Sequence, residues 1–151
     1  MRKLITTALL LIAIPTELMA DDRDAIVGII DDIRVGWEQA DGKPFRRHFL
    51  DFDGARYIES GGQNVGLTDL IEHHVEPEGD ALKLELEFEN PQIHVEGDFA
   101  WAIFDTEVRG TVYKTGRKIH NRGFETIVLR KIDGQWKVLH THSSGRPVKD
   151  K

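Results

Sequence analysis

The sequence predicts a single α+β domain in which three helices pack on one face of a bent antiparallel sheet. Two observations predict this class. Apolar residues recur every three to four positions in the first half of the chain, whereas from about residue 81 they alternate with polar residues. Helices that precede strands, instead of alternating with them, are typical of α+β domains. The 151 residues suffice for one domain with a sizeable core.

The first helix is predicted over residues 22–40, because its apolar side chains fall on one face of a 3.6-residue period. Those side chains are Ile26, Ile30, Ile33 and Trp37. A second, short helix is expected over residues 43–50, with Pro44 near its first position. The third helix, residues 67–76, should end at Pro77, since proline interrupts helical hydrogen bonding.

Four long strands follow, joined by turns that contain glycine or proline. They are predicted over residues 82–95, 99–113, 118–132 and 136–147. A short strand, residues 55–59, and a turn, residues 60–64, lie among the helices. Asn90-Pro91 predicts a bulge in the first long strand. Residues 99–104 are apolar on both faces, so we expect a second subunit to cover the face that the helices leave open.

Composition limits the partners of the protein. The formal net charge is -6 and no block of Lys or Arg occurs, so neither nucleic acid nor an anionic membrane surface is an expected partner. The chain contains no cysteine, which excludes disulfides and thiolate chemistry.

The N-terminus resembles a secretory signal peptide over residues 1–20. Arg2 and Lys3 precede an apolar run from Leu4 to Ile14, which is too short to span a bilayer, since spanning takes ~20 apolar residues. Cleavage is expected near Ala20. The domain itself would then comprise residues 21–151. We therefore expect a periplasmic or secreted protein that has no membrane contact after cleavage.

Two stretches carry a resemblance to a known family. Residues 90–98 read NPQIHVEGD, and the C-terminal strands contain ET at 125–126, DGQW at 133–136 and HTHSSGRP at 140–147. These resemble the association (hub) domain of calcium/calmodulin-dependent kinase II and bacterial SnoaL-like domains, members of the nuclear transport factor 2-like superfamily. The resemblance covers roughly residues 22–147. It implies a cone-shaped α+β fold with a strongly curved sheet, and it leaves function open, because the superfamily includes isomerases, cyclases, dehydratases, binding modules and oligomerisation hubs.

The chain departs from the hub domain at the arginines with which that pocket holds a carboxylate. The corresponding positions hold Thr106 or Glu107, Ile127 and Ser143. The nearest arginines, Arg109 and Arg122, are not required by the resemblance to replace them. The resemblance therefore does not imply an anion-binding pocket in this chain.

The last strand offers two histidines to a site. Strict alternation places His140 and His142 on the same face as the apolar Trp136 and Val138, so this face would lead from the core to a polar end. The resemblance instead gives a pocket role to the position of Ser143, on the opposite face. Either a bulge intervenes, or the histidines face a neighbouring subunit.

Other polar groups fall near the same end of the predicted fold. His74, on the inward face of the third helix, and Glu59, on the short strand, could approach His140 and His142. Imidazoles with a carboxylate suit a transition metal, a general base, or a polar pocket without metal, and they can equally be structural. The sequence favours the last two readings, so we expect neither metal nor cofactor.

Three further groups have both a functional and a structural interpretation. Glu107 and Arg109 continue the strand face of Trp101, which would make a polar mouth above an apolar floor or simply cross-strand ion pairs. Glu125, among apolar neighbours, would be a base with a raised pKa or a partner for Arg109 or Arg122. Beside Tyr57 and Glu59, the glycines at 61 and 62 would admit a ligand or form a tight turn.

The sequence thus predicts an exported SnoaL-like domain that binds a small, partly apolar molecule in its cone and forms a homodimer or higher oligomer. The alternatives are an enzyme of the isomerase or dehydratase type with a His or carboxylate base, and a homo-oligomeric assembly module. No catalytic residue is assigned. The expected pocket residues are Tyr57, Glu59, His74, Trp101, Glu107, Arg109, Arg122, Glu125, His140 and His142.

Overall fold

The computed structural model describes residues 16–149, with side chains from residue 21 onward. The predicted signal peptide therefore lies largely outside the described residues, and only the backbone of residues 16–20 is seen, as the first turns of a helix. In the described part of the chain, no helix combines the length and hydropathy needed to cross a membrane.

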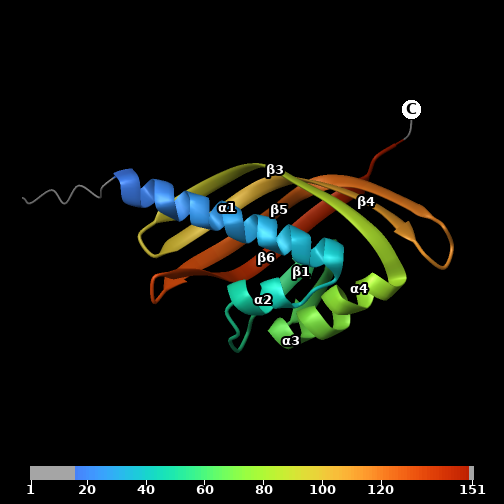
Figure 1. Ribbon diagram of the computed structural model, residues 1–151, viewed down its shortest axis with the longest axis horizontal. Coiled ribbons are helices and arrows are strands. Elements are labelled where there is room, and N and C mark those ends of the chain that lie inside the picture. Colours follow the sequence, from blue (N-terminus) through green and yellow to red (C-terminus); the bar gives the residue numbers. More distant parts are fainter. Residues whose placement is uncertain (1–15, 150–151) are drawn as a thin grey trace, which may run out of the picture.

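One long helix and a group of short ones cover the concave face of a curved six-stranded sheet (Figure 1). The helical segments are α1 (Thr16–Gln39), α2 (Lys43–His48), α3 (Leu67–Leu70), the π-helical turn η1 (Ile71–Val75) and α4 (Glu76–Ala81). The strands are β1 (Arg56–Glu59), β2 (Gly62–Val65), β3 (Leu82–Glu96), β4 (Phe99–Val112), β5 (Lys118–Ile132) and β6 (Gln135–Pro147). In Figure 1, α1 crosses the sheet, whereas α2, α3 and α4 gather beside β1.

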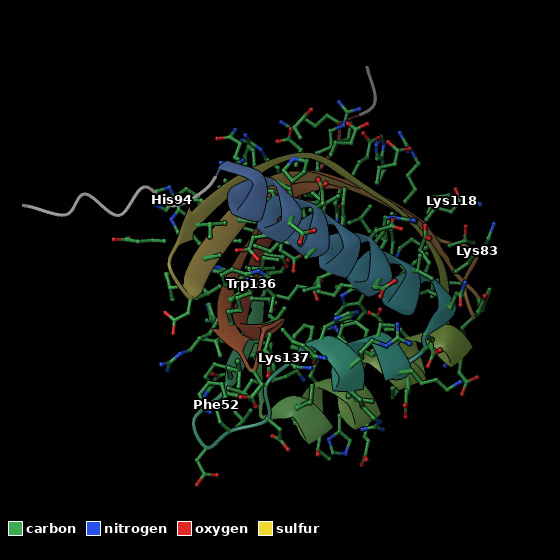
Figure 2. All side chains as sticks on the ribbon, turned by 60° about the vertical axis from the view of Figure 1, so that its left-hand side comes forward. Phe52, Lys83, His94, Lys118, Trp136 and Lys137 are labelled. Atoms are coloured by element: carbon green, nitrogen blue, oxygen red, sulfur yellow. The ribbon has the colours of Figure 1, made fainter. Side chains whose placement is uncertain are left out.

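The core lies between α1 and the concave side of the sheet. Ile26, Ile30 and Ile33 are buried, as their spacing predicts, and Trp37 packs against the same cluster. From the sheet, the core receives Ala100, Ala102, Phe104, Ile127, Leu129, Trp136 and Val138. Figure 2 shows Trp136 beside α1, and the indole Nε1 donates to Asp22 Oδ1 at 2.9 Å. The start of β6 is thereby fixed against the helix.

Two local predictions are wrong. The third helical region continues past Pro77 to Ala81, because η1 ends the preceding hydrogen-bond pattern and Pro77 falls in the first turn of α4, where a missing N–H costs nothing. The expected turn over residues 60–64 is mostly strand: Ser60 and Gly61, both with positive φ, form a tight turn that pairs β2 with β1.

The sheet order is β2-β1-β6-β5-β4-β3. The four long strands are antiparallel neighbours in chain order, as predicted, whereas β1 joins the edge of β6 in parallel register. Tyr57 is thereby opposite Thr141, and Glu59 is opposite Ser143. This parallel pairing brings residues about 84 positions apart in the chain into one polar corner.

Bulges in β3 and β6 decide which side chains face the concave side. The expected bulge at Asn90-Pro91 is present, and Asn90 has a φ of 54°. In β6 a second bulge makes Val138 the partner of Leu129 and His140 the partner of Val128, so that Leu139 is the extra residue. After Leu139, the side chains of β6 therefore point to the face opposite to the one that strict alternation predicts. Of the two alternatives that the sequence left open, the bulge is therefore present, and the strict alternation that placed His140 and His142 with Trp136 is wrong.

Candidate functional site

A cavity of about 130 Å³ lies between the helices and the concave face of the sheet. Helices α1, α2 and α4, the turn η1 and strands β1 and β3 to β6 all contribute side chains to its wall. For scale, an apolar cavity of ~150 Å³ holds benzene. The space is therefore close to the size of one small ring.

One side of the cavity is an arc of aromatic rings. Trp37 meets Phe45 at 5.2 Å between ring centroids, Phe45 meets Phe49 at 5.3 Å, and Phe49 meets Tyr57 at 5.2 Å. The His74 ring continues the arc, 4.9 Å from Trp37. We call these five residues the aromatic arc. Because its rings come from α1, α2, β1 and η1, the arc exists only in the folded chain.

Glu125 lies on the concave face of β5, opposite Phe104 of β4 and Ser143 of β6. The residue is 8% exposed, and no hydrogen bond or ion pair to its carboxyl occurs among the described residues. Burial raises the pKa of Glu125 to about 8, and the negative charge of Glu59 adds to the rise. At neutral pH the carboxyl is therefore mainly protonated and can donate a hydrogen bond.

Tyr57 brings a second unpartnered group to the cavity. Tyr57 is 2% exposed, and its hydroxyl is buried with no hydrogen-bond partner among the residues that the structure describes. Burial raises the pKa of Tyr57 to about 12, so the phenol stays protonated. A buried hydroxyl without a partner costs ~1–3 kcal/mol, a cost that a ligand atom could remove.

A cluster of charged side chains lies at the polar corner of the cavity. His74 Nε2 lies 3.4 Å from Glu59 Oε2 and 3.6 Å from Glu78 Oε1, while Nδ1 is 2.9 Å from Asn64 Oδ1. The contact with Glu78 raises the pKa of His74, and the charge of Glu59 adds to this. Burial raises the pKa of Glu59, opposed by His74. Within residues 16–149, no three His, Asp or Glu side chains are arranged to hold a metal ion.

The convex face of the sheet holds the predicted residues that do not reach the cavity. Glu107 is bound there by Arg109, by His120 Nε2 at 2.7 Å and by Arg122 Nη2 at 2.7 Å. The hydrogen bond from His120 lowers the pKa of Glu107, with Arg122 also contributing. The interpretation of this strand end as cross-strand ion pairs, not a pocket mouth, agrees with this arrangement. Arg122 borders the cavity, but its guanidinium is held by Glu107 on the other side.

The histidines of β6 and Trp101 also lie on the convex face. His142 is exposed, and His140 Nδ1 is 2.6 Å from the carbonyl oxygen of Arg56, a structural contact. Trp101 stacks on His94 at 5.7 Å and is 40% exposed. None of these groups lines the cavity.

The structure therefore brings together five of the ten expected pocket residues. Those at the cavity wall are Tyr57, Glu59, His74, Glu125 and, through its backbone side, Arg122. Sequence reasoning missed Glu78, whose spacing of four residues from His74 was the available signal, because it assumed that the helix ends at Pro77. It also treated Trp37 only as core, although this side chain lines the cavity.

Comparisons with known proteins agree with this architecture. A sequence model of the SnoaL-like domain matches residues 35–149. A search of curated proteins gives no match. A nuclear transport factor 2-like superfamily protein from Salmonella enterica serovar Typhimurium superposes with a TM-score of 0.78 at 26% identity, over 88% of this chain and 96% of that one.

Two more distant structures share the fold. A candidate ketosteroid isomerase from Shewanella frigidimarina has a TM-score of 0.64 at 23% identity, covering 78% of this chain and 92% of its own. A candidate calcium/calmodulin-dependent kinase II association domain from Exiguobacterium sibiricum has a TM-score of 0.69 at 11% identity, covering 85% and 95%. The expected resemblance and the cone-shaped α+β fold are confirmed. The chain belongs to the SnoaL-like domain family and has the nuclear transport factor 2-like fold.

Proposed function

We propose that this protein is an exported SnoaL-like domain that binds a small, partly apolar molecule in the cavity of its cone. The observation that carries the proposal is the cavity itself, whose wall contains the aromatic arc and two groups without a hydrogen-bond partner among the described residues, the Tyr57 hydroxyl and the Glu125 carboxyl. A few polar groups in an apolar hollow are typical of small-molecule sites. Export rests on the signal-peptide pattern of residues 1–20.

A cavity-filling variant tests the binding proposal. Thr106 lines the cavity from β4, and Thr106→Phe should fill it, whereas Thr126→Phe places the same ring on the convex face of β5. Ligand-observed NMR with a panel of benzene-sized compounds should show binding to the original chain and to Thr126→Phe, but not to Thr106→Phe. Equal binding by all three proteins would place the ligand elsewhere and overturn the proposal.

A second candidate function is an isomerase or dehydratase activity. The raised pKa of Glu125, about 8, favours it, because an acid or base poised near neutral pH is effective in proton transfer. In an isomerisation, a carboxylate takes a proton from the carbon next to a carbonyl and returns it to another carbon. A β,γ-unsaturated cyclic ketone in D₂O is a suitable probe: NMR should show isomerisation with deuterium incorporation, lost in Glu125→Gln and Glu59→Gln. Unchanged turnover in both variants would contradict this candidate.

A third candidate is homo-oligomeric assembly through the convex face. Phe99, Trp101 and Phe124 are 43%, 40% and 56% exposed there, an unusual exposure for large apolar side chains. Light scattering should show a dimer or larger assembly, and Trp101→Lys should weaken it. A monomer at micromolar concentration would rule out this candidate.

A further inference from the structure

Among the described residues, the wall of the cavity carries more carboxyl groups than basic groups directed at them. Its wall contains three carboxylic side chains, those of Glu59, Glu78 and Glu125. The one basic group directed at them is His74, which lies between Glu59 and Glu78 and does not reach Glu125 as an ion-pair partner. The Arg122 guanidinium is held on the convex face.

Aromatic rings line the same cavity as the buried carboxyl. Trp37, Phe45, Phe49 and Tyr57 form a continuous arc in the same cavity, and Phe88 adds a ring from β3. Aromatic faces attract organic cations, most strongly where water is excluded. The carboxyl groups and the aromatic rings of the cavity thus both favour a positively charged ligand.

We propose that the cavity binds an organic amine, with its ammonium group beside Glu125 and its apolar body against the aromatic arc. This inference rests on the proposed binding function and adds the class of ligand. An ammonium N–H would give the Glu125 carboxylate the partner that the folded chain lacks, and the Tyr57 hydroxyl is a further unpartnered group within the same wall. A charge-assisted bond of this kind is about twice as strong as a neutral one.

Other ligand charges fit less well. An anionic ligand would meet three carboxyl groups with one imidazole to offset them. A wholly apolar ligand would leave both Glu125 and Tyr57 without partners, which is costly in a water-poor site. The formal net charge of -6 also favours the approach of cations over anions.

Amine binding would be coupled to proton release. Because Glu125 is mainly protonated at neutral pH in the empty protein, an ammonium ligand must displace its proton. The titratable groups that face this carboxyl are Tyr57 and Glu59 from β1, His74 from η1 and Glu78 from α4. Of these, Tyr57 keeps its proton throughout this range, and His74 is charged at low pH. Affinity for the amine should therefore rise from about pH 6 to about pH 8 and then level off.

The test compares three probes of nearly equal shape: benzylamine, benzyl alcohol and benzoate. Calorimetric titration at about pH 8 should show benzylamine binding roughly 10-fold or more tighter than benzyl alcohol, and benzoate weakest. Near neutral pH, the heat of benzylamine binding should differ between buffers of different ionisation enthalpy, which reveals the released proton. Glu125→Gln should abolish the proton release and weaken benzylamine roughly 10-fold or more while changing benzyl alcohol little.

Glu85→Gln is the matched control. It removes the same charge from an exposed position on the convex face of β3, so it should leave benzylamine affinity unchanged. If benzyl alcohol or benzoate binds as tightly as benzylamine, the amine inference is wrong while the cavity remains a binding site. If none of the three binds at millimolar concentration, the amine inference fails together with the binding function.

Discussion

Two glutamates on opposite faces of the same sheet show how differently one fold treats the same side chain. Glu125 on the concave face is 8% exposed, and the Glu107 side chain on the convex face is 12% exposed. Burial raises the pKa of Glu125 to about 8, whereas His120 and Arg122 lower the pKa of Glu107.

The difference lies both in the burial of Glu125 and in the partners of Glu107. Glu107 receives N–H donors from three neighbouring basic residues and stays ionised, so it ties β4 to β5. Glu125 has apolar neighbours and keeps its proton. A sheet face rich in compensating charges serves structure, and a face with an uncompensated group is available for a ligand or for proton transfer.

The largest expected effect comes from removing the ionisable group of Glu125. A carboxyl whose folded pKa lies above its ordinary value of 4.5 stabilises the fold fully below that value and loses this contribution as pH rises towards about 8. The free energy of unfolding should therefore fall by ~1.4 kcal/mol per pH unit over this range, roughly 5 kcal/mol in all. In Glu125→Gln the decline should be much smaller.

Urea unfolding followed by circular dichroism at several pH values measures this difference. The other titrating groups are shared by the two proteins, so the difference between their two pH profiles isolates Glu125. Parallel profiles would mean that the carboxyl is ionised in the folded protein, and the contrast with Glu107 would disappear.

Substitution of Gly123 in β5 should give the next largest effect on stability. A Cβ at this position would lie 1.8 Å from the carbonyl oxygen of Ser144 and 2.7 Å from Gly145 Cα, so the backbones of β5 and β6 would have to separate. Gly123→Ala should therefore destabilise the protein by about 3 kcal/mol or more. The exposed Gly28 of α1 has no atom within 4 Å of a built Cβ, and Gly28→Ala should be neutral or slightly stabilising. Equal melting temperatures for these two variants would contradict the tight approach of β5 and β6.

Tyr57→Phe should change the stability by a smaller amount than Gly123→Ala does, and it should raise it. Removing a buried hydroxyl that has no partner relieves its desolvation cost, so the empty protein should become more stable by about 1 kcal/mol. Calorimetric melting of the ligand-free protein checks this. A loss of stability instead would show that the hydroxyl is hydrogen-bonded in solution.

Glu107→Gln should produce the smallest change, confined to acid pH. A carboxyl with a lowered pKa stabilises the fold above its unfolded value, and this contribution is lost as pH falls through the folded pKa. The original chain should thus lose stability on acidification slightly more steeply than Glu107→Gln, and added salt should reduce the difference. A stability difference between the two proteins that grows towards alkaline pH would mean that the pKa of Glu107 is raised, as it is for Glu125. That result would refute the lowered pKa of Glu107.

Most of the fold could be predicted from local patterns. The spacing of Ile26, Ile30 and Ile33 predicts the buried face of α1, and alternation predicts the four long strands. The tight turn that makes β2 and the continuation of the helix past Pro77 were missed. Both depend on how neighbouring elements satisfy backbone groups, which a single segment does not reveal.

The candidate site was predicted only in part. Glu125 was identified because a carboxyl among apolar residues is unusual, and His74 because of its helical face. His140 and His142 were placed on the wrong side because one extra residue, Leu139, reverses every side chain after it. Alternation shows which residues of a strand share a face, but it does not show which face of the sheet is concave. The expected pocket therefore included Trp101 and Arg109, which lie on the convex face.

The sequence by itself determined the order of α1 and the four long strands and the family, since these depend on short-range periodicity and local motifs. The tertiary structure alone decided which face encloses the cavity and which carboxyl lacks a partner. The parallel pairing of β1 with β6 joins Glu59 to Ser143, and the curvature of the sheet encloses Glu125 beneath the aromatic arc. Charge compensation depends on distances across strands and helices, so the protonation of Glu125 and Glu107 is a property of the assembled fold.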